Sequence, residues 1–198
     1  EMPNGPATAT RFLESLTVAP IDPALALVFP GQGSQKVGMG RDVFESFRSA
    51  RAVFDFADDA LQVRLSAICF EGPEEALTST DNAQPAILTA SLAYLAAAVE
   101  AGTIRHRPSF LAGHSLGEYT ALVAAGSLGL LDALMIVRER GRLMATAGET
   151  NPGMLAAILG LDESTTERIC SDSGAEPANY NLSTQIVIGG THTAVEQA

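Results

Sequence analysis

The chain has 198 residues, of which 46% are hydrophobic, enough for a substantial core in one domain or in one domain with a small appendage. Acidic residues outnumber basic ones by 23 to 12, and the resulting net charge of −11 argues against nucleic acid and anionic membrane surfaces as partners. No segment reaches the ~18 uninterrupted apolar residues of a spanning helix, so a soluble cytoplasmic protein with no membrane contact is expected.

The first predicted secondary-structure elements come after a polar N-terminal stretch. Residues 1–20 lack the basic start and apolar centre of a secretory signal and are expected to form a flexible leader. Residues 24–29 (ALALVF) end at Pro30 and are typical of a strand buried on both faces of a parallel sheet. A glycine-rich loop, residues 31–35 (GQGSQ), comes next, and helical spacing of apolar residues resumes over 43–65.

The middle of the chain repeats the alternation of strand and helix. A helix is expected to start after the capping candidates Asp81 and Asn82, with Pro85 in its first turn, and to stop near Gly102. Residues 109–112 (SFLA) predict a second strand. That strand continues through residues 113–117 (GHSLG) into a helix over 118–125, and a longer helix is predicted over 130–147. Low aromatic content with abundant Ala, Leu and Gly agrees with an α/β fold.

The pattern changes after Met154. Strands are predicted over 155–159 and 185–188, and helices over 162–172 and from 191 onward. This β-α-β-α order is short of a ferredoxin-like unit, so the chain is expected to stop inside a subdomain. The two cysteines, Cys69 and Cys170, have no metal-ligand spacing and are expected to be buried thiols in a reducing cytosol.

The candidate nucleophile is Ser115. It occupies the centre of a Gly-x-Ser-x-Gly elbow, in which flanking glycines permit the strained turn that lifts a hydroxyl above a sheet. The backbone amide of Leu116 would then face the oxyanion, and the loop 31–35 could supply a second amide. Alternatively Ser115 is an ordinary helix N-cap and the loop only a turn. A dinucleotide site is excluded because Lys36 stands where its pattern requires glycine.

Arg140 is singled out by helical periodicity. At 100° per residue it lies within about 60° of the apolar residues of its helix. These are Ala133, Ile136, Val137, Leu143, Met144 and Ala147. A guanidinium on an apolar face needs an anion, which could be a bound carboxylate or an internal Asp or Glu, unless the side chain reaches the edge. Arg138 and Arg142 face the opposite way and are expected to be solvated.

A general base is harder to find. His114 adjoins the nucleophile, but neighbours on such a turn point apart. His106 falls in an expected loop and His192 at an expected helix start, so none of the three histidines is a convincing base. Glu118 lies in the first turn of a helix, where a carboxylate complements the helix dipole.

Four motifs together give a specific resemblance. They are FPGQGSQ (29–35), QPA (84–86), GHSLGEY (113–119) and Arg140-Gly141. In order and spacing they resemble the malonyl-CoA:acyl carrier protein transacylases of fatty acid synthesis and the related acyltransferase domains of polyketide synthases. The resemblance covers the chain from about Ala26 to its end.

The resemblance implies an α/β-hydrolase-like core over 21–150 and an inserted ferredoxin-like subdomain over 151–198, both incomplete here. Ser115 would be the nucleophile, Gln32 and Leu116 would give the oxyanion amides, and Arg140 would hold the carboxylate of malonate. The substrates would be malonyl-CoA and acyl carrier protein, with no cofactor or metal.

Further substrate-side positions come from the same resemblance. Residues 80–84 (TDNAQ) look like the Thr-x-x-Ala-Gln signature of malonyl-selective members, which assigns Gln84 to the acyl site. His114, Asn181 and Gln185 are also expected to contact substrate, and Asn179 falls in the same region.

One departure limits the assignment. Members of the family are longer, and their catalytic histidine follows the inserted subdomain at a position beyond Ala198. The sequence therefore predicts a fragment whose base is absent or carried by a second chain. A polyketide synthase acyltransferase, a serine esterase or thioesterase, and a fragment inactive by itself are the alternatives.

Overall fold

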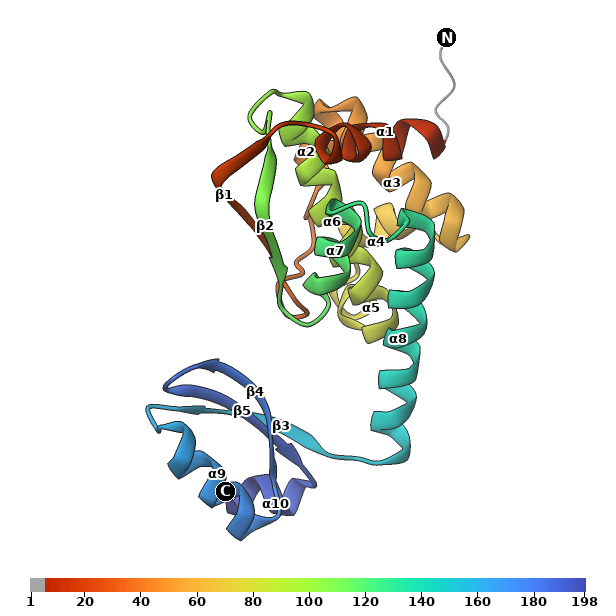
Figure 1. The fold of residues 1–198 in the computed structure, drawn as a ribbon. Coiled ribbons are helices and arrows are strands. Elements are labelled where there is room, and N and C mark those ends of the chain that lie inside the picture. Colours follow the sequence, from red (N-terminus) through yellow and green to blue (C-terminus); the bar gives the residue numbers. More distant parts are fainter. Residues whose placement is uncertain (1–5) are drawn as a thin grey trace. The chain divides into compact units, whose positions relative to one another are not determined.

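The computed structural model describes residues 6–198 and divides the chain into two units, one ending at Leu143 and the other running from Met144 to Ala198 (Figure 1). The first unit contains α1 (Pro6–Thr17), β1 (Ile21–Phe29), α2 (Arg41–Ser46), α3 (Arg48–Leu61), α4 (Leu65–Glu71), α5 (Glu74–Thr78), α6 (Thr80–Glu100), β2 (Arg107–Gly113), α7 (Gly117–Ala124) and most of α8 (Leu130–Thr150). The α/β class is confirmed. The boundary expected after residue 150 falls earlier, within α8.

The expected flexible leader is wrong for most of its length. Residues 6–17 form α1, in which Leu13 and Leu16 are buried in the main apolar cluster. These two residues lie three apart, so they share one face of the helix and cover the core with it. Residues 1–5 lie outside the described part of the chain.

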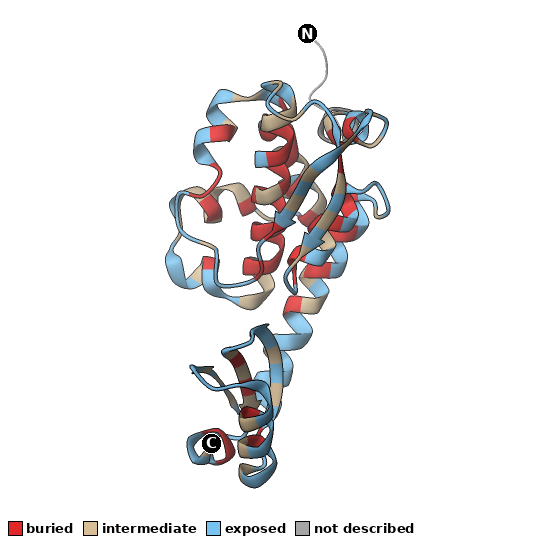
Figure 2. Ribbon diagram, turned by 60° about the vertical axis from the view of Figure 1, so that its left-hand side comes forward, coloured by how far each residue is buried: buried red, intermediate tan, exposed pale blue. Residues whose placement is uncertain are grey.

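The sheet of the first unit consists of β1 and β2, paired in parallel as expected, with Phe29 opposite Gly113. The prediction of burial on both faces is wrong for the first strand, because Val28 is 76% exposed; Phe110 on β2 is also 73% exposed. Figure 2 shows exposed and intermediate residues along both strands. Helix α7 packs on both strands, and in the described chain the alternate side chains face outward. An apolar run alone does not reveal how many faces of a strand are covered.

The core lies around α3 and α6, which pack against each other. Helix α6 is buried along most of its length because alanines alternate with larger apolar residues. It begins at Thr80, just before the predicted capping candidates Asp81 and Asn82, and Pro85 sits inside the helix. The stretch 43–65, predicted to be helical, is divided among α2, α3 and the start of α4.

The second unit contains β3 (Met154–Leu159), α9 (Glu163–Ser173), β4 (Glu176–Leu182), β5 (Gln185–Gly190) and α10 (His192–Gln197). Its antiparallel sheet has the order β3-β5-β4. Strand β4 was missed from sequence because Pro177 and two asparagines give it low strand propensity, which an edge strand tolerates. The order is therefore β-α-β-β-α.

Both cysteines are buried free thiols, as expected from their spacing. Burial raises the pKa of the Cys69 thiol to about 12. Separately, within residues 6–198 no helix combines the length and apolar character that crossing a bilayer requires.

Candidate active site

Ser115 lies on a strained turn between β2 and α7. Its φ of 52° is in the left-handed region, which a residue with a side chain rarely adopts. A methyl group added at Gly113 would collide with the carbonyl of Gly117, and one at Gly117 would collide with the carbonyl of Phe29. The two glycines therefore let β1, β2 and α7 approach closely enough to form the elbow.

The alternative in which Ser115 merely caps a helix is wrong. The N-cap of α7 is Leu116, and no side chain caps this helix. The Ser115 hydroxyl instead accepts a hydrogen bond of 3.0 Å from Nη2 of Arg140. The serine is exposed and its oxygen is aimed at another functional group.

The loop after β1 lies directly beside the elbow. The His114 amide donates to the Phe29 carbonyl at 3.1 Å, and a methyl group at Gly31 would lie 2.9 Å from Nδ1 of His114. Gln32, which follows Gly31, donates from its side-chain amide to the Thr80 hydroxyl at 3.4 Å. Among the turn, loop and cap hydrogen bonds of the described residues, the backbone N–H of Gln32 and that of Leu116 do not act as donors to a backbone carbonyl.

Arg140 connects the elbow with α6. Its Nη1 donates to Oε1 of Gln84 at 2.6 Å, while Nη2 donates to Ser115. Gln84 is completely buried, so it holds the guanidinium from a rigid position. The ring of Tyr119 lies 5.9 Å from the guanidinium carbon, within range of a cation–π contact.

The environment of Arg140 differs in part from the prediction. Ala133 and Val137 are buried, but Ile136, Leu143 and Met144 are more than 40% exposed. The stripe is therefore buried only in the first half of α8, and Arg140 is half-buried at its edge. No Asp or Glu among residues 6–143 of the first unit forms an ion pair with it, so an internal carboxylate partner is excluded within that unit.

The neighbouring arginines behave differently from each other. Arg142 is exposed, as expected, and donates two hydrogen bonds of 2.7 and 2.8 Å to Glu139. These hydrogen bonds lower the pKa of the Glu139 carboxyl. The expectation of a solvated Arg138 is wrong, because this residue is half-buried and donates to the Leu61 carbonyl at 3.0 Å.

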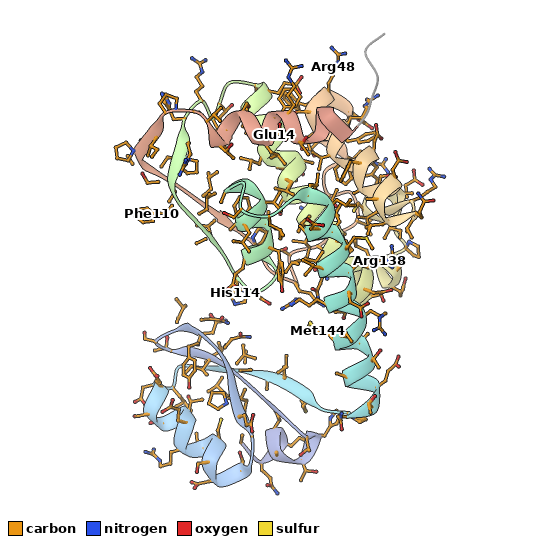
Figure 3. All side chains as sticks on the ribbon, turned by 45° about the vertical axis from the view of Figure 1, so that its right-hand side comes forward. Glu14, Arg48, Phe110, His114, Arg138 and Met144 are labelled. Carbon is orange, nitrogen blue, oxygen red and sulfur yellow. The ribbon has the colours of Figure 1, made fainter. Side chains whose placement is uncertain are left out.

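That none of the three histidines is the general base stays a prediction. His114 is exposed at the end of β2, where Figure 3 shows it at the edge of the first unit. His106 precedes β2 and is exposed, and His192 begins α10 in the second unit. Glu118 is exposed in the first turn of α7, the position expected of a residue that complements the helix dipole.

Two substrate-side candidates belong to the second unit. Asn181 is exposed on β4, and Gln185 is half-buried at the start of β5. Their contact with substrate stays a prediction. Within residues 6–198 no group of His, Cys, Asp and Glu side chains has the arrangement of a metal site.

Two residues of the site were not predicted individually. Thr80 accepts the hydrogen bond from Gln32, and Tyr119 stacks near Arg140. Tyr119 lies in the first turn of α7, the helix that follows the elbow directly, so its place near the site is a local feature of the sequence. The contact of Thr80 with Gln32 joins residues 48 apart in the chain, which local pattern does not encode.

Known proteins with similar sequence and structure agree with this arrangement. Residues 26–198 match the acyl transferase domain. The chain belongs to this family. It is 47% identical over 179 residues to a malonyl CoA-acyl carrier protein transacylase of Bacillus subtilis, a match that covers 88% of the chain and 56% of the relative. The resemblance drawn from the motifs is thus confirmed.

Solved structures of acyl transferases share the fold. An acyl-carrier-protein S-malonyltransferase from Bartonella henselae superposes with a TM-score of 0.82 at 46% identity, covering 86% of this chain and 56% of that one. A malonyl-transacylase in complex with a type II polyketide synthase acyl carrier protein gives 0.80 at 40% identity, covering 90% and 57%. The chain spans little more than half the length of these acyl transferases.

Proposed function

We propose that this chain carries the nucleophile and the acyl-selecting group of a transferase that moves malonyl from malonyl-CoA to the pantetheine thiol of an acyl carrier protein. The observation that carries the proposal is the Arg140 guanidinium, which reaches the Ser115 hydroxyl without an ion-pair partner among residues 6–143 of the first unit. Such a cation beside a nucleophile suits an acyl group that ends in a carboxylate.

In the first half-reaction, Ser115 Oγ attacks the thioester carbonyl. A C–O bond forms between Ser115 and the acyl carbon, and the C–S bond to CoA breaks. The proton of the Ser115 hydroxyl ends on the sulfur of CoA, which is released as a thiol. The developing oxyanion would be held by the backbone amides of Gln32 and Leu116, the latter at the N-terminus of α7. The product is a malonyl ester of Ser115.

Selection of malonyl would rest on Arg140 and Gln84. Gln84 holds Nη1 at 2.6 Å, so the guanidinium is oriented before substrate arrives. The free carboxylate of malonyl could replace the serine contact and pair with Nη2. Acetyl lacks this carboxylate and would leave the cation unpaired, a loss of about 1.5 to 3 kcal/mol for a hydrogen bond to a charged group.

In the second half-reaction, the carrier thiol attacks the serine ester. A new C–S bond forms, the C–O bond breaks, and the thiol proton returns to Ser115, giving ping-pong kinetics without a cofactor or metal. A general base must assist both steps. We infer that it comes from the part of the relatives' length that has no counterpart in this chain, on a continuing or a second chain.

We also propose a more specific fold for each of the two units. The parallel pair with its elbow supports an α/β-hydrolase-like core, and the β-α-β-β-α order of the second unit supports a ferredoxin-like subdomain one strand short of completion. In that arrangement Asn181, Gln185 and His114 would contact substrate. A cytoplasmic location would give access to the CoA thioester and to the carrier protein.

Incubation of the completed enzyme with malonyl-CoA and a holo carrier protein tests the reaction. Here and in the acylation experiments below, the completed enzyme is this chain together with the continuing or second chain that supplies the base. Mass spectrometry should find malonyl on the carrier thiol, in excess over acetyl when acetyl-CoA competes. A serine esterase would instead release free malonate to water whether or not the carrier is present. Free malonate as the only product, or equal transfer of acetyl and malonyl, would contradict the proposal.

A further inference from the structure

We propose that Gly141 is a positioning residue that sets the preference for carboxylated acyl groups, an inference that rests on the function proposed above. Gly141 is buried where α8 crosses the first turn of α6. A methyl group there would collide with the Thr80 carbonyl oxygen and would lie 2.8 Å from the Asp81 Cα. Both obstacles are backbone atoms, which cannot move aside as a flexible side chain can.

Glycine is otherwise unfavourable at this position. Inside a helix it is about 1 kcal/mol less favourable than alanine. Gly148, on the same helix, provides the contrast, because a methyl group there would meet no atom within 4 Å. Close approach of two helix backbones is therefore the structural reason for glycine at 141 and is absent at 148.

The close approach of the α8 and α6 backbones determines where the guanidinium of Arg140 lies. Arg140 precedes Gly141 directly, and its anchor Gln84 lies one turn after Thr80 on α6. A displacement of α8 by about 1 Å would lengthen the 3.0 Å contact with Ser115 beyond hydrogen-bond range. Misplacement of that size is enough to impair positioning of a reacting group.

The same turn of α6 also contacts the candidate oxyanion loop. The Thr80 hydroxyl accepts from the side-chain amide of Gln32, while the Thr80 carbonyl faces Gly141. Thr80 thus lies between the acyl-selecting arginine and the loop beside the nucleophile. Gly141 acts through these neighbours without touching substrate.

Competition between equimolar malonyl-CoA and acetyl-CoA for Ser115 tests the inference, with both adducts measured in one mass spectrum. Gly141→Ala should lower the ratio of malonyl to acetyl adduct at least about tenfold, the effect of losing a charged hydrogen bond. General destabilisation would reduce both adducts together and leave the ratio unchanged. Gly148→Ala adds the same methyl group to the same helix and should keep the wild-type ratio.

A second control separates selectivity from stability. Val137→Ala removes a buried side chain one turn earlier on α8 and should lower stability while keeping the ratio. If Gly141→Ala unfolds in buffer, both variants are measured in sucrose, which favours the folded state.

The outcomes distinguish the two proposals. If Gly141→Ala keeps the wild-type preference for malonyl, or if Val137→Ala loses that preference to the same extent, Gly141 does not have the proposed role. Either result leaves the proposed function unaffected. A wild-type chain that acylates without preferring malonyl overturns the proposed function and this inference with it.

Discussion

Arg140→Ala should lower the ratio of malonyl to acetyl ester at Ser115 by about two orders of magnitude. The variant removes the cation that would pair with the malonyl carboxylate, whereas acetyl loses no partner. Gln84 would also be left without its 2.6 Å donor at a completely buried position. The measurement is the competition of the two CoA thioesters, read by intact mass.

Two variants control this result. Arg142→Ala removes an equal charge two residues away, but Arg142 is exposed and bonded to Glu139, so the ratio should not change. Arg140→Lys should recover only part of the preference, because a single ammonium cannot bond Gln84 and an acyl carboxylate with the fork of a guanidinium. An unchanged ratio in Arg140→Ala would exclude Arg140 as the selecting group.

Gly117→Ala should reduce the free energy of unfolding by about 3 kcal/mol or more. The added methyl group would strike the Phe29 carbonyl and lie 2.9 Å from the Pro30 carbonyl oxygen, both on the backbone that ends β1. The elbow would therefore have to separate from the loop that carries Gln32. Urea unfolding followed by circular dichroism measures the change.

The matched control is again Gly148→Ala. It places alanine in an open helical position and should stabilise the chain by up to about 1 kcal/mol. Equal unfolding midpoints for Gly117→Ala and the wild type would show that the elbow is not closely packed as described.

The sequence predicts that Ser115, Gln84 and Arg140 belong to one site, and hydrogen bonds join them in the structure, while their roles in the reaction stay predictions. Backbone atoms lie so close to positions 113 and 117 that a side chain does not fit there, so the two glycines in the sequence predict the close approach of the chain at the elbow. Periodicity selected Arg140, although four of the six apolar residues on its face of α8 are exposed, namely Ile136, Leu143, Met144 and Ala147. Arg140 still lies beside Ser115 because the two buried members, Ala133 and Val137, pack into the core.

The misses have physical causes that a single sequence conceals. Strand β4 lies at an edge and so tolerates Pro177 and asparagines, which weakened the signal of a strand. Helix α1 has few apolar residues, and its burial depends on distant parts of the core. Thr80 and Gly141 meet through the packing of two helices far apart in sequence, a contact that local pattern does not encode.

The most direct measurement is peptide mapping of the wild-type chain, completed by the continuing or second chain that supplies the base, after incubation with malonyl-CoA alone. We expect a malonyl ester on Ser115 that is absent from Ser115→Ala and is removed by a pantetheine thiol with formation of malonyl thioester. A completed enzyme that stays unmodified, or that carries malonyl on a residue other than Ser115, would exclude Ser115 as the nucleophile.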